Sequence, residues 1–158
     1  MTNAIIPDNV TSIEASAFYG NHLDSVSIHD NVDHIGHSAF AGNRLTSVSI
    51  PNSIVRIEAG VFERNQLTSI IIPDSVKSIA NVAFSNNKLT NVIIPNNVTS
   101  VEHGAFMGNP LTGVTIGANV TLGYGVFASG FEDSYESNGR MAGTYTRSDT
   151  GSVTWIRN

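Results

Sequence analysis

The chain has 158 residues, which suits one domain of ordinary size with a buried core. Charged residues make up only 13% and the formal net charge is −5, while Asn, Ser and Thr together fill 48 positions. The eight Lys and Arg residues are scattered, so the composition argues against nucleic acid and anionic membranes as partners. The absence of cysteine excludes disulfides and thiolate chemistry, and no apolar run is long enough to predict a membrane span.

The first predicted element is the strand tail Ala4-Ile5-Ile6, which leads into a 22-residue repeat. Each copy carries a phenylalanine, an asparagine three residues later and a leucine two residues after that. The copies run 7–28, 29–50, 51–72, 73–94 and 95–116, and a partial sixth begins at Gly117. The two columns of most structural interest are Phe18, Phe40, Phe62, Phe84 and Phe106, and Asn21, Asn43, Asn65, Asn87 and Asn109.

Each repeat predicts a strand, a shorter extended piece and a tight turn. In the strand from Leu45 to Ile50, apolar Val48 and Ile50 alternate with serines, and the proline that follows ends the strand. The extended piece 54–57 leads to the turn 58–62, which is too short for an α-helix. One unit cannot bury its own apolar residues, so the copies must stack, with one parallel strand per repeat. At about 4.8 Å per strand, five repeats span roughly 25 Å.

The segment L-x-x-V-x-I matches the core of leucine-rich repeats, and I-P-x-x-V-x-x-I-x-x-x-A-F-x-x-N-x-L is more specific. This longer pattern resembles the BspA-like leucine-rich repeat, also called the Treponema pallidum type, over residues 4–128. Relatives often carry cysteine in the column that here holds asparagine. The stacking of the repeats predicts a mostly β, α/β-type repeat solenoid, right-handed, over residues 1–128, and the resemblance agrees with it. We expect residues 129–158 to form a C-terminal β-hairpin cap.

Residues 129–158 leave the repeat. Asn138-Gly139 predicts a hairpin turn, and 143–147 and 152–156 predict two strands around a polar turn. We expect this segment to cover the last open coil with four aromatic side chains, or alternatively to use them as a carbohydrate- or surface-binding module. The string F-x-x-x-Y-x-x-N-G-R-x-A-G-T-Y-T-R…W also resembles the C-terminal module of treponemal members of the family. The four aromatic residues are Phe131, Tyr135, Tyr145 and Trp155.

The asparagine and phenylalanine columns are interpreted as a structural ladder. An inward asparagine can bond the backbone of its own coil and the next, satisfying amides that a tight turn leaves unpaired. The phenylalanines are expected in the core. A row of stacked asparagines could instead hold a ligand, but the packing role explains its regularity better.

Partner-binding residues are expected on the outward side of the strands, because packing occupies the constant columns. Most of these positions are small and polar, but two isoleucines are predicted to lie side by side on adjacent strands. They could also simply strengthen the sheet, or be covered by the C-terminal segment. The candidate residues are Ser47, Ser49, Ser69, Ile71, Asn91, Ile93 and Thr115.

No constellation of catalytic or metal-ligating residues is evident, and no cofactor is predicted. His34 and His37 lack a third ligand at a suitable spacing for zinc. Glu58 and Glu102 share a column but lie two repeats apart, which suits no retaining carboxylate pair. The triplet at Asp149 sits in a polar turn rather than an apolar catalytic loop. The chain is therefore not expected to be an enzyme.

The resemblance implies a bacterial surface or secreted protein that attaches to host matrix proteins, host cells or other bacteria. On that basis the chain is expected to be an adhesin-like virulence protein, of treponemal type, that binds a protein or glycan; no signal peptide is recognised in it. The alternative is a structural or assembly scaffold that self-associates through open solenoid ends. The N-terminal end is the expected contact, because the sequence offers no cap there.

Overall fold

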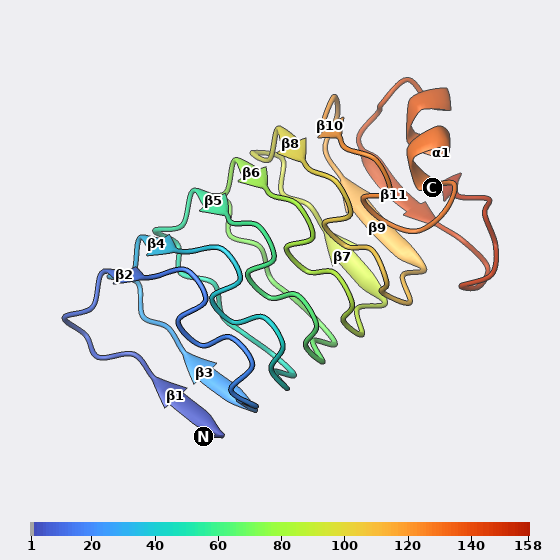
Figure 1. Cartoon of the computed structure of the whole chain (residues 1–158). Coiled ribbons are helices and arrows are strands. Elements are labelled where there is room, and N and C mark those ends of the chain that lie inside the picture. Colours follow the sequence, from blue (N-terminus) through green and yellow to red (C-terminus); the bar gives the residue numbers. More distant parts are fainter. Residues whose placement is uncertain (1) are drawn as a thin grey trace.

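The computed structural model describes residues 2–158 as a stack of coils that ends in a helix and a hairpin (Figure 1). Residues far apart in sequence lie side by side because each coil repeats the path of the one before it. The elements are β1 (Asn3–Ile5), β2 (Ser12–Ile13), β3 (Ser25–Ser27), β4 (His34–Ile35), β5 (Arg56–Ile57), β6 (Ser78–Ile79), β7 (Asn91–Ile93), β8 (Ser100–Val101), β9 (Gly113–Ile116), β10 (Thr121–Leu122), α1 (Phe131–Ser137), β11 (Gly143–Thr146) and β12 (Ile156–Arg157).

The strand predicted at the end of each repeat forms one side of the stack. β1 pairs with β3 and β7 with β9, each in parallel and with partners 22 residues apart. Between these pairs the ladder narrows to a parallel bridge from Ser49 to Ile71 and a hydrogen bond from the Thr68 N–H to the Thr46 carbonyl. The coils thus stay in register where the strands themselves are interrupted.

The shorter extended piece gives the more continuous ladder. β5, β6, β8 and β10 form one four-stranded parallel sheet, and β2 pairs with β4. Each of these strands has only two residues, and its apolar residue faces the core; Ile57 and Ile79, for example, are buried partners. The prediction of a parallel β-solenoid with a 22-residue spacing is confirmed, and it has two strand ladders along its length.

The tight turns add a third set of bonds between coils. The Phe18 N–H donates to the Ala39 carbonyl of the following coil at 2.8 Å, and the Phe62 N–H donates to the Ala83 carbonyl at 2.9 Å. In both cases the turn N–H points toward the C-terminal end of the stack. The turn backbone is therefore satisfied without any α-helix in the repeat.

The phenylalanine column runs through the core as a stack of nearly parallel rings. Consecutive rings from Phe18 to Phe106 have centroids 5.2–5.7 Å apart and planes within 16° of parallel. The leucine column beside them is fully buried from Leu23 to Leu111. Phe18, at the N-terminal end, is only partly buried because no coil covers its outer face within the described residues.

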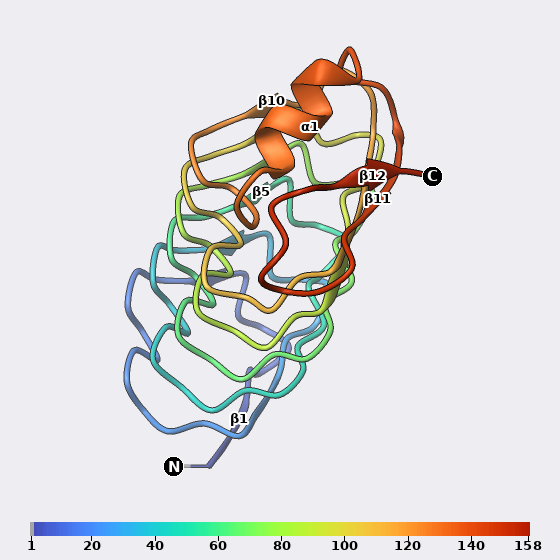
Figure 2. The same cartoon turned by 90° about the vertical axis from the view of Figure 1, so that its right-hand side faces the viewer.

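The C-terminal segment differs from the prediction first at its expected turn. Asn138 and Gly139 do not form a hairpin; they end helix α1, with Gly139 in the left-handed conformation at φ 66°. Phe131 and Tyr135, four residues apart, bury one face of that helix. The helix lies across the C-terminal end of the stack (Figure 2).

The two strands predicted near the C-terminus do form, and they pair with each other. β11 adds antiparallel to β9, and β12 pairs antiparallel with β11, so the chain turns back onto the sheet it has just completed. The second strand begins at Ile156 rather than Ser152, and a long loop joins the two. No helix within residues 2–158 combines the length and apolar character needed to cross a membrane.

Candidate binding surface

The outward face of the strands presents the predicted isoleucines to solvent. Ile71 is 83% exposed and Ile93 is 64% exposed, and each occupies the same position in its repeat. Ile71 pairs across the sheet with Ser49, and Ile93 with Thr115, so the apolar side chains are flanked by small polar ones. The predicted residues that surround them are also exposed, namely Ser47, Ser49, Ser69 and Asn91.

The C-terminal segment does not cover these isoleucines, as one alternative had expected. β11 and β12 continue the sheet sideways, because β11 pairs edge to edge with β9. Thr115, the last of the predicted residues, is partly buried, and its hydroxyl lies 2.9 Å from that of Thr144. The added strands therefore extend the outward face.

Sequence reasoning missed one residue of this face. Ile156 of β12 is 63% exposed and pairs with Thr146, which in turn pairs with Gly113. The sequence predicted a strand at 152–156, with Ile156 as its last residue, but not the sheet that this strand joins. Only the antiparallel addition of β11 to β9 shows that Ile156 belongs to the same sheet as Ile93.

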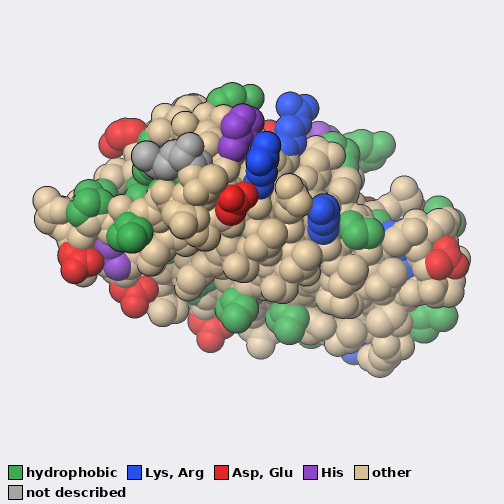
Figure 3. All heavy atoms as spheres, turned by 90° about the horizontal axis from the view of Figure 1, so that it is seen from below, with side chains coloured by type: hydrophobic (Ala, Val, Ile, Leu, Met, Phe, Trp, Pro, Cys, Tyr) green, Lys and Arg blue, Asp and Glu red, His purple; other side chains and the backbone are tan. Residues whose placement is uncertain are grey.

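Charge is sparse on this molecule. Figure 3, seen from below, shows scattered charged side chains, with the basic ones near the middle of that face and hydrophobic ones in small separate groups. The shortest ion pair within residues 2–158 joins Arg56 to Glu102, two coils away, at 2.9 Å, and Arg56 also contacts Glu58 at 3.3 Å. The hydrogen bond to Glu102, with the field of both carboxylates, raises the pKa of Arg56. Glu58 and Glu102 thus share one guanidinium, which suits a surface clamp better than acid catalysis.

The asparagine column lies inside the stack and bonds backbone. The Asn65 Oδ1 accepts a hydrogen bond from the Leu45 N–H at 3.1 Å. Its Nδ2 donates to the carbonyls of Phe40 and Phe62 at 2.9 and 3.2 Å. The bonded partners belong to the same coil and to the preceding coil, whereas the sequence had suggested the following one. The same pattern holds at Asn43, Asn87 and Asn109.

Asn21 is the exception in this column. It is exposed, because a coil before the first would have to supply the backbone groups that the other asparagines bond. The amide is therefore buried only where another coil precedes it in the stack.

The remaining polar candidates are surface features. Among the described residues, no three His, Cys, Asp or Glu side chains gather as metal ligands would, and His34 and His37 are exposed. The exposed Asp149 closes a turn: its Oδ1 accepts from the N–H groups of Gly151 and Ser152 at 2.8 and 3.0 Å. A hydrogen bond from the Ser148 hydroxyl and these backbone bonds lower the pKa of Asp149, which favours the ionised, turn-forming carboxylate.

The four C-terminal aromatic residues are buried, so a binding module built on their rings is ruled out. Phe131 packs edge-on against Trp155 and Tyr145, with centroids 5.3 and 5.4 Å away. The Tyr135 hydroxyl donates to the Gly117 carbonyl at 2.6 Å. The Arg147 guanidinium lies 5.0 Å from the Trp155 ring, and its burial lowers the pKa of Arg147. These rings pack against the end of the solenoid and cannot contact a ligand.

Comparison with protein families finds a match to the BspA type leucine rich repeat region, in six copies, over residues 1–112. A solved structure of a leucine rich cell surface protein from Faecalibacterium prausnitzii A2-165 is similar over 73% of this chain, with 28% identity and a TM-score of 0.55. A leucine-rich repeat protein from Bacteroides ovatus ATCC 8483 matches over 80% of this chain, with 19% identity and a TM-score of 0.42. The chain spans 41% and 52% of the lengths of these two proteins. Comparison with curated protein sequences finds no match.

Proposed function

The chain belongs to the BspA-type leucine-rich repeat family, and we propose that it is a non-enzymatic, adhesin-like surface protein. Leucine-rich repeat proteins mediate protein interactions, and a rigid stack offers a preorganised face to a macromolecule. The proposed partner is a protein or glycan on a host cell, in host matrix or on another bacterium, and attachment would make the chain a virulence factor. The similarity to a leucine rich cell surface protein supports display at the bacterial surface.

Two parts of this proposal rest on the C-terminal segment. We assign residues 1–128 to the repeat solenoid and 129–158 to a cap, because Phe131 packs against Phe127 and the Tyr135 hydroxyl bonds the Gly117 carbonyl of the last coil. The likeness of its sequence to treponemal members of the family supports a treponemal source.

The observation that carries the binding proposal is the exposed pair Ile71 and Ile93. Ile93 projects from β7, which pairs in parallel with β9, and Ile71 projects from the preceding coil at an isolated parallel bridge to Ser49. Because neighbouring coils fix both backbones, binding there costs little ordering entropy. Two exposed isoleucines whose strand partners are Ser49 and Thr115 suit the central contact of a small interface.

A binding array of matrix proteins and glycans, followed by two substitutions, tests the proposal. Ile71→Asp and Ile93→Asp should each abolish or strongly weaken any hit, because a carboxylate would be desolvated in the contact. Ile5→Asp is the matched control: Ile5 is also 83% exposed on the same outward row, at the far end of the stack. A hit that survives both central substitutions would contradict the proposed site.

The alternative function, a scaffold that self-associates, has an observation of its own. β1 is paired only on its β3 side within the described residues, and Ile5 and Tyr19 at this end are 83% and 59% exposed. Light scattering distinguishes the two. A dimer or larger species that Ile5→Asp dissociates would favour the scaffold, and a strict monomer would favour the adhesin.

A further inference from the structure

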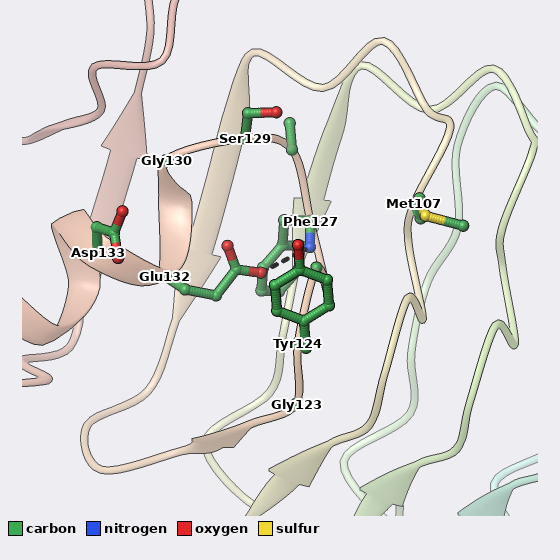
Figure 4. Close-up of a pocket in the computed structure, with 10 residues that line it drawn as sticks. Met107, Gly123, Tyr124, Phe127, Ser129, Gly130, Glu132 and Asp133 are labelled. Atoms are coloured by element: carbon green, nitrogen blue, oxygen red, sulfur yellow. Dashed lines mark hydrogen bonds between the residues drawn. The ribbon is translucent and has the colours of Figure 1, made fainter.

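A hollow of about 500 Å³ lies where the last coil meets helix α1 (Figure 4). Figure 4 shows Tyr124 on the last coil with the Glu132 side chain extending toward it from the first turn of the helix, while Asp133 and Met107 line the two opposite edges. Gly125 also lines the hollow, and a side chain there would meet open space. The volume is enough for one or two amino-acid side chains of a partner.

Tyr124 is the unusual member of this lining. Its side chain is 85% exposed, yet its backbone is held: the Tyr124 carbonyl accepts from the Gly104 N–H at 3.1 Å and from His103 Nδ1 at 2.8 Å. The His103 ring lies parallel to the tyrosine ring, with centroids 6.0 Å apart and planes within 7°. Met107, which is 44% exposed, adds a second apolar side chain to the lining of the hollow. An aromatic ring fixed on a coil and open to solvent is arranged for stacking.

The charge of the hollow is negative. Glu132 is partly buried, and its Oε1 accepts a hydrogen bond from the Phe127 N–H at 3.3 Å. Within residues 2–158, neither Glu132 nor Asp133 forms an ion pair, and no basic side chain lines the space. A fixed ring beside two unneutralised carboxylates favours a flat or compact cation.

We propose that this hollow binds an arginine-bearing basic segment of a partner protein. The guanidinium stacks on Tyr124, its N–H groups donate to the free oxygen of Glu132, and its stem extends toward Met107, while Asp133 adds negative charge at the edge of the hollow. The net charge of −5 attracts such a segment over a longer range. This site is separate from the isoleucine pair on the sheet face.

The probe is a short labelled peptide with two arginines, compared with the same peptide carrying citrulline at both positions. The arginine peptide should shift the backbone amide resonances of Tyr124, Gly125 and Asp133, weaken in high salt, and bind better than the citrulline peptide. Tyr124→Ala and Asp133→Asn should each weaken it about three- to fivefold, as expected for one cation–π contact or one exposed charge pair.

Three matched variants serve as controls. Tyr124→Phe keeps the ring, Glu136→Gln removes a charge from the same helix outside the hollow, and Ile71→Asp alters the sheet face; all should bind like the wild type. Shifts confined to another surface, equal binding of the citrulline peptide, or unchanged binding by both Tyr124→Ala and Asp133→Asn would overturn the proposal. So would maltotriose shifting these amides where the arginine peptide does not, since the hollow would then be a saccharide site.

Discussion

The single inward asparagine of each interior coil bonds backbone groups that the turn does not pair with other backbone groups. Its carbonyl oxygen accepts one N–H and its amide nitrogen donates to two carbonyls, as at Asn65. The repeat predicted an inward asparagine because the column never varies. It did not predict the direction: the N–H that needs a partner sits 20 residues earlier, so the bonds run to the preceding coil.

The substitution Asn65→Ala should lower the free energy of unfolding by about 1–3 kcal/mol, because it leaves a buried N–H and two carbonyls without this partner. The exposed Asn21 in the same column is the control, and Asn21→Ala should change stability by no more than about 0.5 kcal/mol. Urea denaturation followed by circular dichroism measures both. Equal effects at the two positions would show that the column acts without the observed bonds.

The C-terminal helix is the element that sequence reasoning missed. An Asn-Gly pair favours a hairpin turn, yet it equally provides the left-handed residue that ends a helix, and Gly139 has that role. The spacing of Phe131 and Tyr135 was the signal for a helix, since residues four apart share one face. The aromatic residues were expected to cover the last coil, and Phe131 does pack against Phe127. The four rings are too deeply buried to bind a ligand.

Gly130 fixes how this helix meets the hairpin loop. Its φ is 80°, and a Cβ there would lie within 1.9 Å of the Val153 carbonyl oxygen. We expect Gly130→Ala to destabilise the protein by about 3 kcal/mol or more and to loosen the segment around Trp155. Gly125→Ala is the control, with a similar φ of 60° but open space around it, and should cost about 1–2 kcal/mol.

Tryptophan fluorescence with denaturation distinguishes these glycines, because Trp155 is the only tryptophan and its indole N–H donates to the Ser129 carbonyl. A red shift at low denaturant is expected for Gly130→Ala alone. If both variants lose the same stability and show the same fluorescence shift, the close approach of Gly130 to Val153 does not contribute to stability.

For the whole molecule, the fold followed from the period, because a 22-residue unit has only its neighbours to pack against. The candidate binding surface could be predicted only in part from the repeat. Ile71 and Ile93 were found from alternation within a repeat, but Ile156 required the pairing of β11 with β9, which no periodicity encodes. The hollow beside Tyr124 was not foreseen at all, since it forms between the last coil and a helix that was not predicted.

Within residues 2–158 the first coil has a neighbour on one side only, so stability should rise along this stack from its N-terminal end. The Phe18 N–H bonds to the second coil and the Phe62 N–H to the fourth, at similar distances. Amide hydrogen exchange should nevertheless be faster at Phe18, where local opening breaks fewer contacts. Mass spectrometry after proteolysis can compare the two coils. Equal protection would mean that the solenoid opens only as a single unit.

The turn hydrogen bonds also give the stack a chemical polarity. In the second coil, for example, the carbonyls of His37, Ala39 and Ala41 accept hydrogen bonds from N–H groups of the first coil. Their counterparts in the first coil, at positions 15, 17 and 19, accept no backbone bond among residues 2–158. Along its turn edge this end is an acceptor surface. Two copies meeting there would oppose carbonyl to carbonyl, so association favours a head-to-tail partner that brings donors over a two-fold symmetric pair.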